Sequence, residues 1–216
     1  DSPLSLQVHP DARHAAAGFA AQESAGVPTD APDRTYPDPH HKPELFYALT
    51  GVEAVCGFRA PRRAVEVLDG LAAPLARELH AALVAEPDIR GLATAFRTLV
   101  DPATRPSAAE VTEVVTACTQ RLWDGSPSPR ADRTAVVLGE EHPGDVGAVA
   151  SLLLNPVSLR PGEALYVPVG TVHAYLSGLG VEVMAASDNE LRAGLTTKHT
   201  DPLALLDAVA WTAGPP

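Results

Sequence analysis

Apolar and polar positions alternate like strands towards both ends of the chain and follow a helical period in its middle. The stretch from Leu159 to Arg192 places β-branched and apolar residues between the turn-forming Pro161-Gly162 and Gly178. This pattern predicts short strands joined by tight turns. Alternate side chains of a strand share a face, so we expect His173 and Tyr175 on the same face.

A second strand-like alternation opens the chain, in SPLSLQVHP (Ser2–Pro10). It places Gln7 and His9 on one face, where they are candidate metal ligands or, alternatively, the solvent-facing polar residues of a half-exposed strand. We expect a short Ala-rich helix at 15–25. The following segment, 27–39, holds four prolines and is predicted to be a loop.

Charged residues stand directly before the next apolar run. The segment HHKPELFYALTGVEAVCGF begins with His40, His41, Lys42 and, two residues later, Glu44. Imidazole nitrogen and carboxylate oxygen are both zinc ligands, and His41 and Lys42 are candidate proton carriers. The alternative is a solvated, charged entry to a surface strand. The local pattern does not decide between these two interpretations.

From Pro61 to Trp123 the apolar residues recur at helical spacing. Leucines repeat every three or four positions and are interrupted by Gly70 and Pro74, which predicts two helical segments. Two further helices are predicted to start at the N-caps Asp88 and Ser107, the second within a capping box. We interpret these apolar stripes as core.

These patterns divide the chain into four parts. We expect two β-rich parts, 1–59 and 148–216, which together form one domain. A helical insertion at 60–123 lies between them, followed at 124–147 by a polar linker and a return to β character. Near the end, the segment 203–211 is predicted to be a helix or a strand.

Composition narrows the class of protein. The net charge of −11 argues against nucleic acid and anionic membranes as partners. Cys56 and Cys118 lack a paired spacing, which favours packing residues with reduced thiols in a cytoplasmic protein. No run approaches the roughly 18 apolar residues of a membrane span. The chain begins at Asp1 in a strand-like stretch and its only methionine is Met184, so we expect a fragment whose N-terminus is missing.

Separate parts of the chain offer several metal ligands. Two imidazoles, a carboxylate and an amide oxygen come from His9, His173, Glu44 and Gln7. Three or four such ligands from different strands, with room for water or substrate, are what an open catalytic zinc site requires. If Glu182 and Arg192 face the same interior, that interior is a polar pocket, which indicates a functional site.

Six segments of the chain carry long and specific motifs: LSLQVHPD, YPDPHHKPELFYALT, HPGDVG, LLLN, LRPGEALYVPVGTVHAYLSG and ASDNELRAGLTTKHTD. Together they resemble the type I mannose-6-phosphate isomerases, zinc-dependent enzymes of the cupin superfamily. The resemblance runs from about Pro3 to Asp201. It implies an α+β protein, with a mainly β, jelly-roll-like cupin barrel formed by 1–59 and 148–216 and with an inserted helical subdomain.

The resemblance also implies the residues of the site. Zn²⁺ would be held by the four ligands assembled above, Gln7, His9, Glu44 and His173. The pocket for the sugar phosphate would be lined by His41, Lys42, Glu182, Asp188 and Arg192. In this family the reaction interconverts mannose 6-phosphate and fructose 6-phosphate through a cis-enediol, which requires a base and a stabilised enediolate.

Two residues compete for the role of the base. Lys42 must lose its proton, which zinc and Arg192 favour electrostatically, whereas Glu182 is already anionic but can be engaged by a cation. The balance favours Lys42, with His41 or Asp188 helping to open the pyranose ring. Arg192 would hold charge on the enediolate or the phosphate.

We expect the substrate-binding residues to be Arg192, Ser5 and Arg13. Ser5 would donate to the phosphate, and Arg13 would replace the charge of a lysine that commonly follows the HPD or HPN motif in the family. Family members often have Asn-His before KPE, where this chain has His40-His41. Their chains also continue before the QVHP strand and, with another β domain, after the ASDN segment.

Two other function classes compete with the isomerase. The first is a sugar-phosphate-binding cupin without turnover, which the truncated chain favours. The second is an iron cupin oxygenase, which usually has a His-x-His pair, and Gln7-x-His9 is a poor substitute for it. For the isomerase we expect a cytoplasmic monomer whose partner is a small sugar phosphate.

Overall fold

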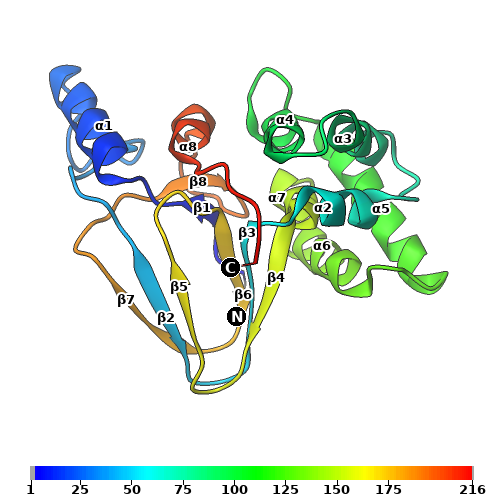
Figure 1. The fold of residues 1–216 in the computed structure, drawn as a ribbon. Coiled ribbons are helices and arrows are strands. Elements are labelled where there is room, and N and C mark those ends of the chain that lie inside the picture. Colours follow the sequence, from blue (N-terminus) through cyan, green and yellow to red (C-terminus); the bar gives the residue numbers. More distant parts are fainter. Residues whose placement is uncertain (1–2, 216) are drawn as a thin grey trace.

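The computed structural model describes residues 3–215 (Figure 1). The predicted strand at 2–10 is shorter than expected, and its first residue lies outside the described residues. The strands are β1 (Leu6–Val8), β2 (Glu44–Ala48), β3 (Val52–Phe58), β4 (Leu154–Leu159), β5 (Ala164–Val167), β6 (His173–Ser177), β7 (Gly180–Met184) and β8 (Leu191–Gly194). The helices are α1 (Ala12–Ser24), α2 (Pro61–Leu68), α3 (Pro74–Ala85), α4 (Ile89–Val100), α5 (Ala108–Trp123), α6 (Pro129–Glu141), α7 (Val146–Ala150) and α8 (Pro202–Ala208).

The strands form two antiparallel sheets. One has the order β4-β3-β6-β1-β8 and the other the order β5-β2-β7. Apolar side chains from both sheets share one core, formed by Ala48, Val52, Ala54, Cys56, Val157, Leu159, Leu165, Val167 and Tyr175. The sheets therefore face each other, and the fold is α+β with antiparallel sheets.

The predicted turns lie where the strands reverse. Pro161-Gly162 separates β4 from β5, and Gly178 separates β6 from β7. Gly178 has a φ of +110°, and a Cβ atom there would lie 2.5 Å from the carbonyl oxygen of Gly51. Only glycine combines that conformation with such a close approach, which explains the residue at this position.

The helices α2 to α7 form a block beside the larger sheet (Figure 1). The predicted N-caps are confirmed, because Asp88 accepts from the Arg90 backbone N–H and Ser107 forms a capping box with Glu110. The predicted apolar stripes are buried in the block's core, among them Leu79, Leu83, Leu92, Phe96, Leu99, Val111, Val114 and Cys118.

The linker and β return predicted for 124–147 are wrong, because helix α6 occupies Pro129–Glu141 and helix α7 follows it. The Ser- and Pro-rich sequence suggested a linker, yet Pro129 occupies the first turn of α6, where its missing N–H costs nothing. Ala135 and Leu138 of α6 are buried against the block. Pro129 therefore starts a helix where the composition of the segment predicted a linker.

The remaining helices flank the sheets. Helix α1 begins three residues before the predicted start, because Asp11 accepts from the His14 N–H at 2.8 Å and caps it. The C-terminal segment is a helix, α8. Both cysteines are buried and free, as predicted. None of the helices in the described part of the chain has the length and apolar character that crossing a membrane requires.

Candidate metal centre

Neighbouring strands of the larger sheet bring three candidate site residues into one row. Gln7 on β1 pairs with His173 on β6 and with Arg192 on β8. Directly opposite residues of antiparallel strands place their side chains on the same face. His9 follows Gln7 by two residues and extends β1 on the same face.

The smaller sheet supplies two carboxylates to the facing surface. On β2, Glu44 and Phe46 are two residues apart, and Phe46 pairs with Glu182 on β7. Phe46 stacks on Tyr175 of the larger sheet with ring centroids 4.4 Å apart. Glu44 and Glu182 therefore lie on the face of their sheet that is turned towards the row of Gln7.

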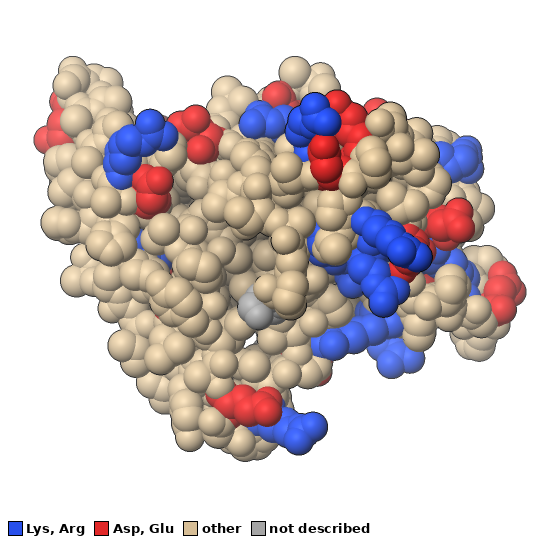
Figure 2. All heavy atoms as spheres, viewed as in Figure 1, with Lys and Arg blue, Asp and Glu red and all other residues tan. Residues whose placement is uncertain are grey.

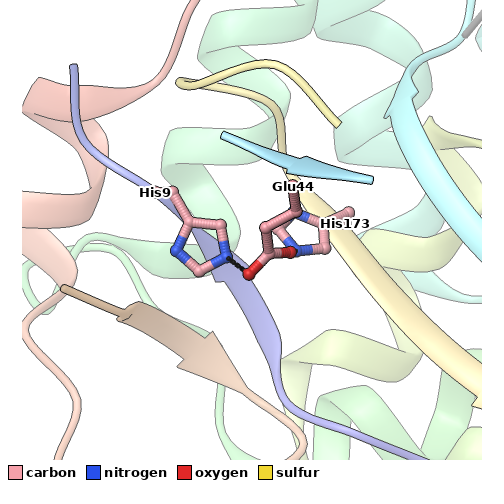
Figure 3. A group of neighbouring side chains, drawn as sticks. All are labelled: His9, Glu44 and His173. Atoms are coloured by element: carbon pink, nitrogen blue, oxygen red, sulfur yellow. Dashed lines mark ion pairs between the residues drawn. The ribbon is translucent and has the colours of Figure 1, made fainter. Parts of the chain in front are cut away.

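Two imidazoles and a carboxylate converge between the sheets (Figure 3). His9 Nε2 lies 2.9 Å from one Glu44 carboxylate oxygen, and His173 Nε2 lies 3.5 Å from the other. One ligand atom from each residue lies within 4.8 Å of the other two. All three side chains are 1% exposed.

Backbone carbonyls fix the outer nitrogens of both imidazoles. His9 Nδ1 donates to the Asn189 carbonyl at 2.8 Å, and His173 Nδ1 donates to the Thr171 carbonyl at 2.9 Å. With Nδ1 donating, each Nε2 is turned towards Glu44, and in the neutral imidazole this nitrogen carries the lone pair that a metal ion would take. Acceptors that face one another in this way are the usual surroundings of a metal ion.

The charge of Glu44 fits the same interpretation. Burial raises the pKa of its carboxyl, but the contacts with His173 and His9 outweigh burial and hold the pKa below its ordinary value. One of its carboxylate oxygens, Oε2, is buried and has no hydrogen-bond partner among the described residues. A buried anion with an unpaired oxygen between two imidazoles suits a divalent cation.

Gln7 lies against the same nitrogens. Its amide Nε2 is 3.5 Å from His9 Nε2 and 3.4 Å from His173 Nε2, while its Oε1 accepts from Ser5 Oγ at 2.7 Å. In this orientation the amide presents its nitrogen to the centre. Turning the amide by 180° would present Oε1 instead, and Ser5 Oγ would then accept from the nitrogen.

A chain of alternating charges leads away from the centre. Lys42 Nζ lies 3.4 Å from Glu44 and 2.9 Å from Glu190, and Glu190 forms an ion pair with Arg192. The Lys42 side chain is only 5% exposed. Two of the predicted cations, Lys42 and Arg192, are therefore joined through Glu190, which was not among the predicted site residues.

Glu182 is perturbed by its surroundings. Burial, followed by the negative charge of Glu44, raises the pKa of its carboxyl to about 7. Burial and the charge of Glu182 also raise the pKa of the Tyr175 hydroxyl. Glu182 Oε1 and Tyr175 Oη are buried without a hydrogen-bond partner among the described residues. Unpaired polar atoms beside the centre are what a polar ligand would satisfy.

Three predicted residues stand apart from this group. His41 and Asp188 are exposed, and Arg13 is exposed on α1, where it contacts His14. Within residues 3–215, no hydrogen bond or ion pair connects these three side chains to the central residues. Their assigned roles stay predictions.

The residues that hold the centre in place were not among the predicted site residues. Asn189 is buried, accepts from His9 through its carbonyl, and donates through its side-chain amide to the carbonyls of Asp38 and His40. It thereby ties the segment before β2 to the histidine. Its signal in the sequence was the polar ASDNE loop between two predicted strands, where an asparagine readily bonds to backbone groups.

The fold and this cluster together define a class: an α+β protein with a buried group of N and O ligands, suited to a metal ion, between two antiparallel sheets. Comparison with known proteins gives the family. The family described as "Phosphomannose isomerase type I, catalytic domain" matches residues 1–61. The mannose-6-phosphate isomerase of Escherichia coli (strain K12) is 39% identical over 213 residues, which are 99% of this chain and 52% of that protein.

Two further comparisons agree. The mannose-6-phosphate isomerase of Salmonella typhimurium is 40% identical over 92% of this chain and 49% of its own length. The crystal structure of a zinc-bound mannose 6-phosphate isomerase superposes with a TM-score of 0.84 and 38% identity, covering 99% of this chain and 53% of that one. The chain belongs to the type I phosphomannose isomerase family and spans about half the length of the curated relatives it matches.

Proposed function

We propose that the chain carries the metal centre and the proton-transfer groups of a zinc-dependent isomerase that interconverts mannose 6-phosphate and fructose 6-phosphate. The observation that carries this proposal is the convergence of His9, Glu44 and His173, three buried side chains whose possible metal-ligating atoms lie within 4.8 Å of one another. Zn²⁺ would be held by these three residues and by Gln7 with its amide turned. The ion would act as a Lewis acid or orient the sugar oxygens.

The remaining groups perform the proton transfer and hold the substrate. In the isomerisation a proton leaves one of the carbons C1 and C2 and returns to the other through a cis-enediol, so a base must stand beside both carbons. Lys42 takes this role, with Glu182 as the competing base. Arg192 holds the negative charge that develops on the enediolate or the charge of the phosphate.

The remaining predicted residues act on the pyranose ring and on the phosphate of the substrate. His41 or Asp188 assists the opening of the pyranose ring. Ser5 and Arg13 bind the phosphate, although Ser5 Oγ already bonds to Gln7 at 2.7 Å and would have to turn from it or accept from it instead. Support for this half of the proposal comes from the resemblance of the motifs and not from contacts.

The architecture belongs to the same proposal. The two facing sheets would form a jelly-roll-like cupin barrel, with the metal ligands on strands of both sheets. The helical block would be a subdomain inserted between β3 and β4. The antiparallel order of the strands and the shared apolar core support this interpretation.

A coupled assay with metal analysis of the same sample tests the function. The purified chain is incubated with mannose 6-phosphate, and fructose 6-phosphate is measured before chelation, after chelation and after zinc is restored. We expect turnover that disappears with the chelator and returns with zinc. Turnover that survives complete removal of the metal would contradict the proposal.

The alternative function is a sugar-phosphate-binding module without turnover. The same samples separate the two functions. Zinc binding and sugar-phosphate binding without any product would select the binding module.

A further inference from the structure

Glu190 lies between the two cations of the site. One of its carboxylate oxygens is 2.9 Å from Lys42 Nζ, and the other forms an ion pair with the Arg192 guanidinium. Glu190 immediately precedes β8 and Arg192 is the second residue of that strand, so the spacing of two places both side chains on one side of the backbone. A single carboxylate thus bridges two cations that come from distant parts of the chain.

The side chains that form this bridge are buried or partly buried, which increases the energetic importance of their charges. The side chains of Lys42, Arg192 and Glu190 are 5%, 17% and 27% exposed. An ammonium group that is this deeply buried is costly unless an anion compensates it. The other carboxylate near Lys42 is Glu44 at 3.4 Å, which also serves the two imidazoles. When Glu44 binds a metal ion, Glu190 is the acid left to compensate Lys42 among the described contacts.

We propose that Glu190 is a positioning and specificity residue, which holds Lys42 and Arg192 in place and competes with the anionic groups of the substrate for both cations. The proposal rests on the proposed function and deepens it. Burial opposes ionisation of Glu190, but Lys42 and Arg192 lower the pKa of its carboxyl, so the bridge is an ionic one. Anionic substrate groups that reach the two cations must share them with Glu190 or displace it.

This competition has opposite consequences for binding and for turnover. Glu190→Gln removes the competing charge, so the substrate should bind more tightly and KM should fall. The same change frees Lys42 from its partner, so the amine is no longer oriented towards the reacting carbons and kcat should fall on the order of tenfold, as the loss of a charged hydrogen bond implies. Glu190→Asp keeps the charge and should keep the wild-type KM.

Lysine NMR tests the bridge without any need for turnover. The chain contains two lysines, Lys42 and Lys198, and Lys198 is exposed. In protein labelled with ¹⁵N at lysine Nζ, we expect one ammonium signal protected from solvent exchange, which Lys42→Met removes. Glu190→Gln should abolish the protection and leave the Lys198 signal unchanged. Protection of Lys42 that persists in Glu190→Gln would overturn the bridge.

Kinetics and binding test the competition. Wild type, Glu190→Gln and Glu190→Asp are compared with the control Glu23→Gln, which removes a 2.7 Å ion pair to the buried Arg34 on another part of the surface. A fall of both KM and kcat in Glu190→Gln alone supports the proposal. A raised KM, or unchanged kinetics with lowered stability, overturns it. If wild type has no turnover, the proposed function fails, and calorimetric titration with fructose 6-phosphate, with tighter binding expected in Glu190→Gln, still decides the competition.

Discussion

Two buried carboxylates in this molecule have opposite surroundings. Asp132 on α6 is fully buried and accepts from Arg121 Nε at 2.8 Å and from Ser126 Oγ at 2.5 Å. The remaining donors of Arg121 bond to the carbonyls of Val67 and Asp69. Each of these donors, on Arg121 and Ser126, thus faces an acceptor. Glu44, by contrast, lies between two imidazole nitrogens, and within the described residues its Oε2 has no hydrogen-bond partner.

The difference separates a structural ion pair from a candidate site. A buried charge whose bonds are all made ties helices α2, α5 and α6 together. A buried charge whose surroundings leave bonds unmade costs stability, and such costs are typical of sites that bind a ligand. On the face that Figure 2 shows, acidic and basic side chains lie beside one another in several small groups, so charge alone does not identify a site.

The largest expected effect is a loss of turnover when a residue of the candidate site, Lys42, is replaced. Lys42→Met should reduce turnover by roughly 10²–10⁴-fold, the range for loss of a general base. Bound zinc should stay, because the proposed ligands are untouched. Parallel measurement of turnover and zinc content checks both points, and undiminished turnover would exclude Lys42 as the base in favour of Glu182.

Breaking the structural ion pair between Asp132 and Arg121 should lower stability. Asp132→Ala leaves Arg121 without its carboxylate and should lower the free energy of unfolding by about 3–5 kcal/mol. Denaturant titration measures this change. The control is Glu66→Gln, which removes an exposed pair with Arg63 and should leave stability unchanged. An unaffected stability in Asp132→Ala would show that the buried pair does not hold the helices.

Adding zinc should stabilise the chain through the candidate centre alone. A ligand at 100 times its Kd raises the free energy of unfolding by about 2.7 kcal/mol. We expect this gain in wild type and its absence in His173→Ala, measured by thermal unfolding with and without a chelator. An equal gain in both proteins would place the zinc elsewhere.

The smallest effect is expected for Glu44→Gln in zinc-free protein. Glu44 contacts His9 and Lys42, but its Oε2 has no hydrogen-bond partner among the described residues, so losing its charge should lower the free energy of unfolding by only about 1–2 kcal/mol. The matched change Asp132→Asn should cost clearly more. If denaturant titrations gave the same loss of unfolding free energy for both variants, the proposed difference between the two carboxylates would be contradicted.

The sequence predicted much of the fold because local signals agreed with the tertiary structure. The N-caps Asp88 and Ser107 and the turns at Gly162 and Gly178 are local features that short patterns specify. Helix α6 was missed because Pro129 and its serine neighbours signal a loop, while the buried partners that stabilise the helix are distant in sequence.

The site was predicted less completely for the same reason. The ligand types and motifs pointed to His9, Glu44 and His173, and the register of two sheets brings them together. The roles of Glu190 and Asn189 could not be predicted, because they depend on contacts across about 150 positions of the chain, which periodicity and motif spacing do not reveal. Only the folded chain shows that Lys42 and Arg192 share one carboxylate.

Zinc stoichiometry tests the central claim most directly. Wild type, His173→Ala, Glu44→Ala and the structural control Asp132→Asn are loaded with zinc, dialysed and analysed for metal and protein. We expect one zinc ion per chain in wild type and in the folded fraction of Asp132→Asn, and almost none in the other two variants. Full occupancy in His173→Ala or Glu44→Ala would contradict the claim that these residues form the metal centre.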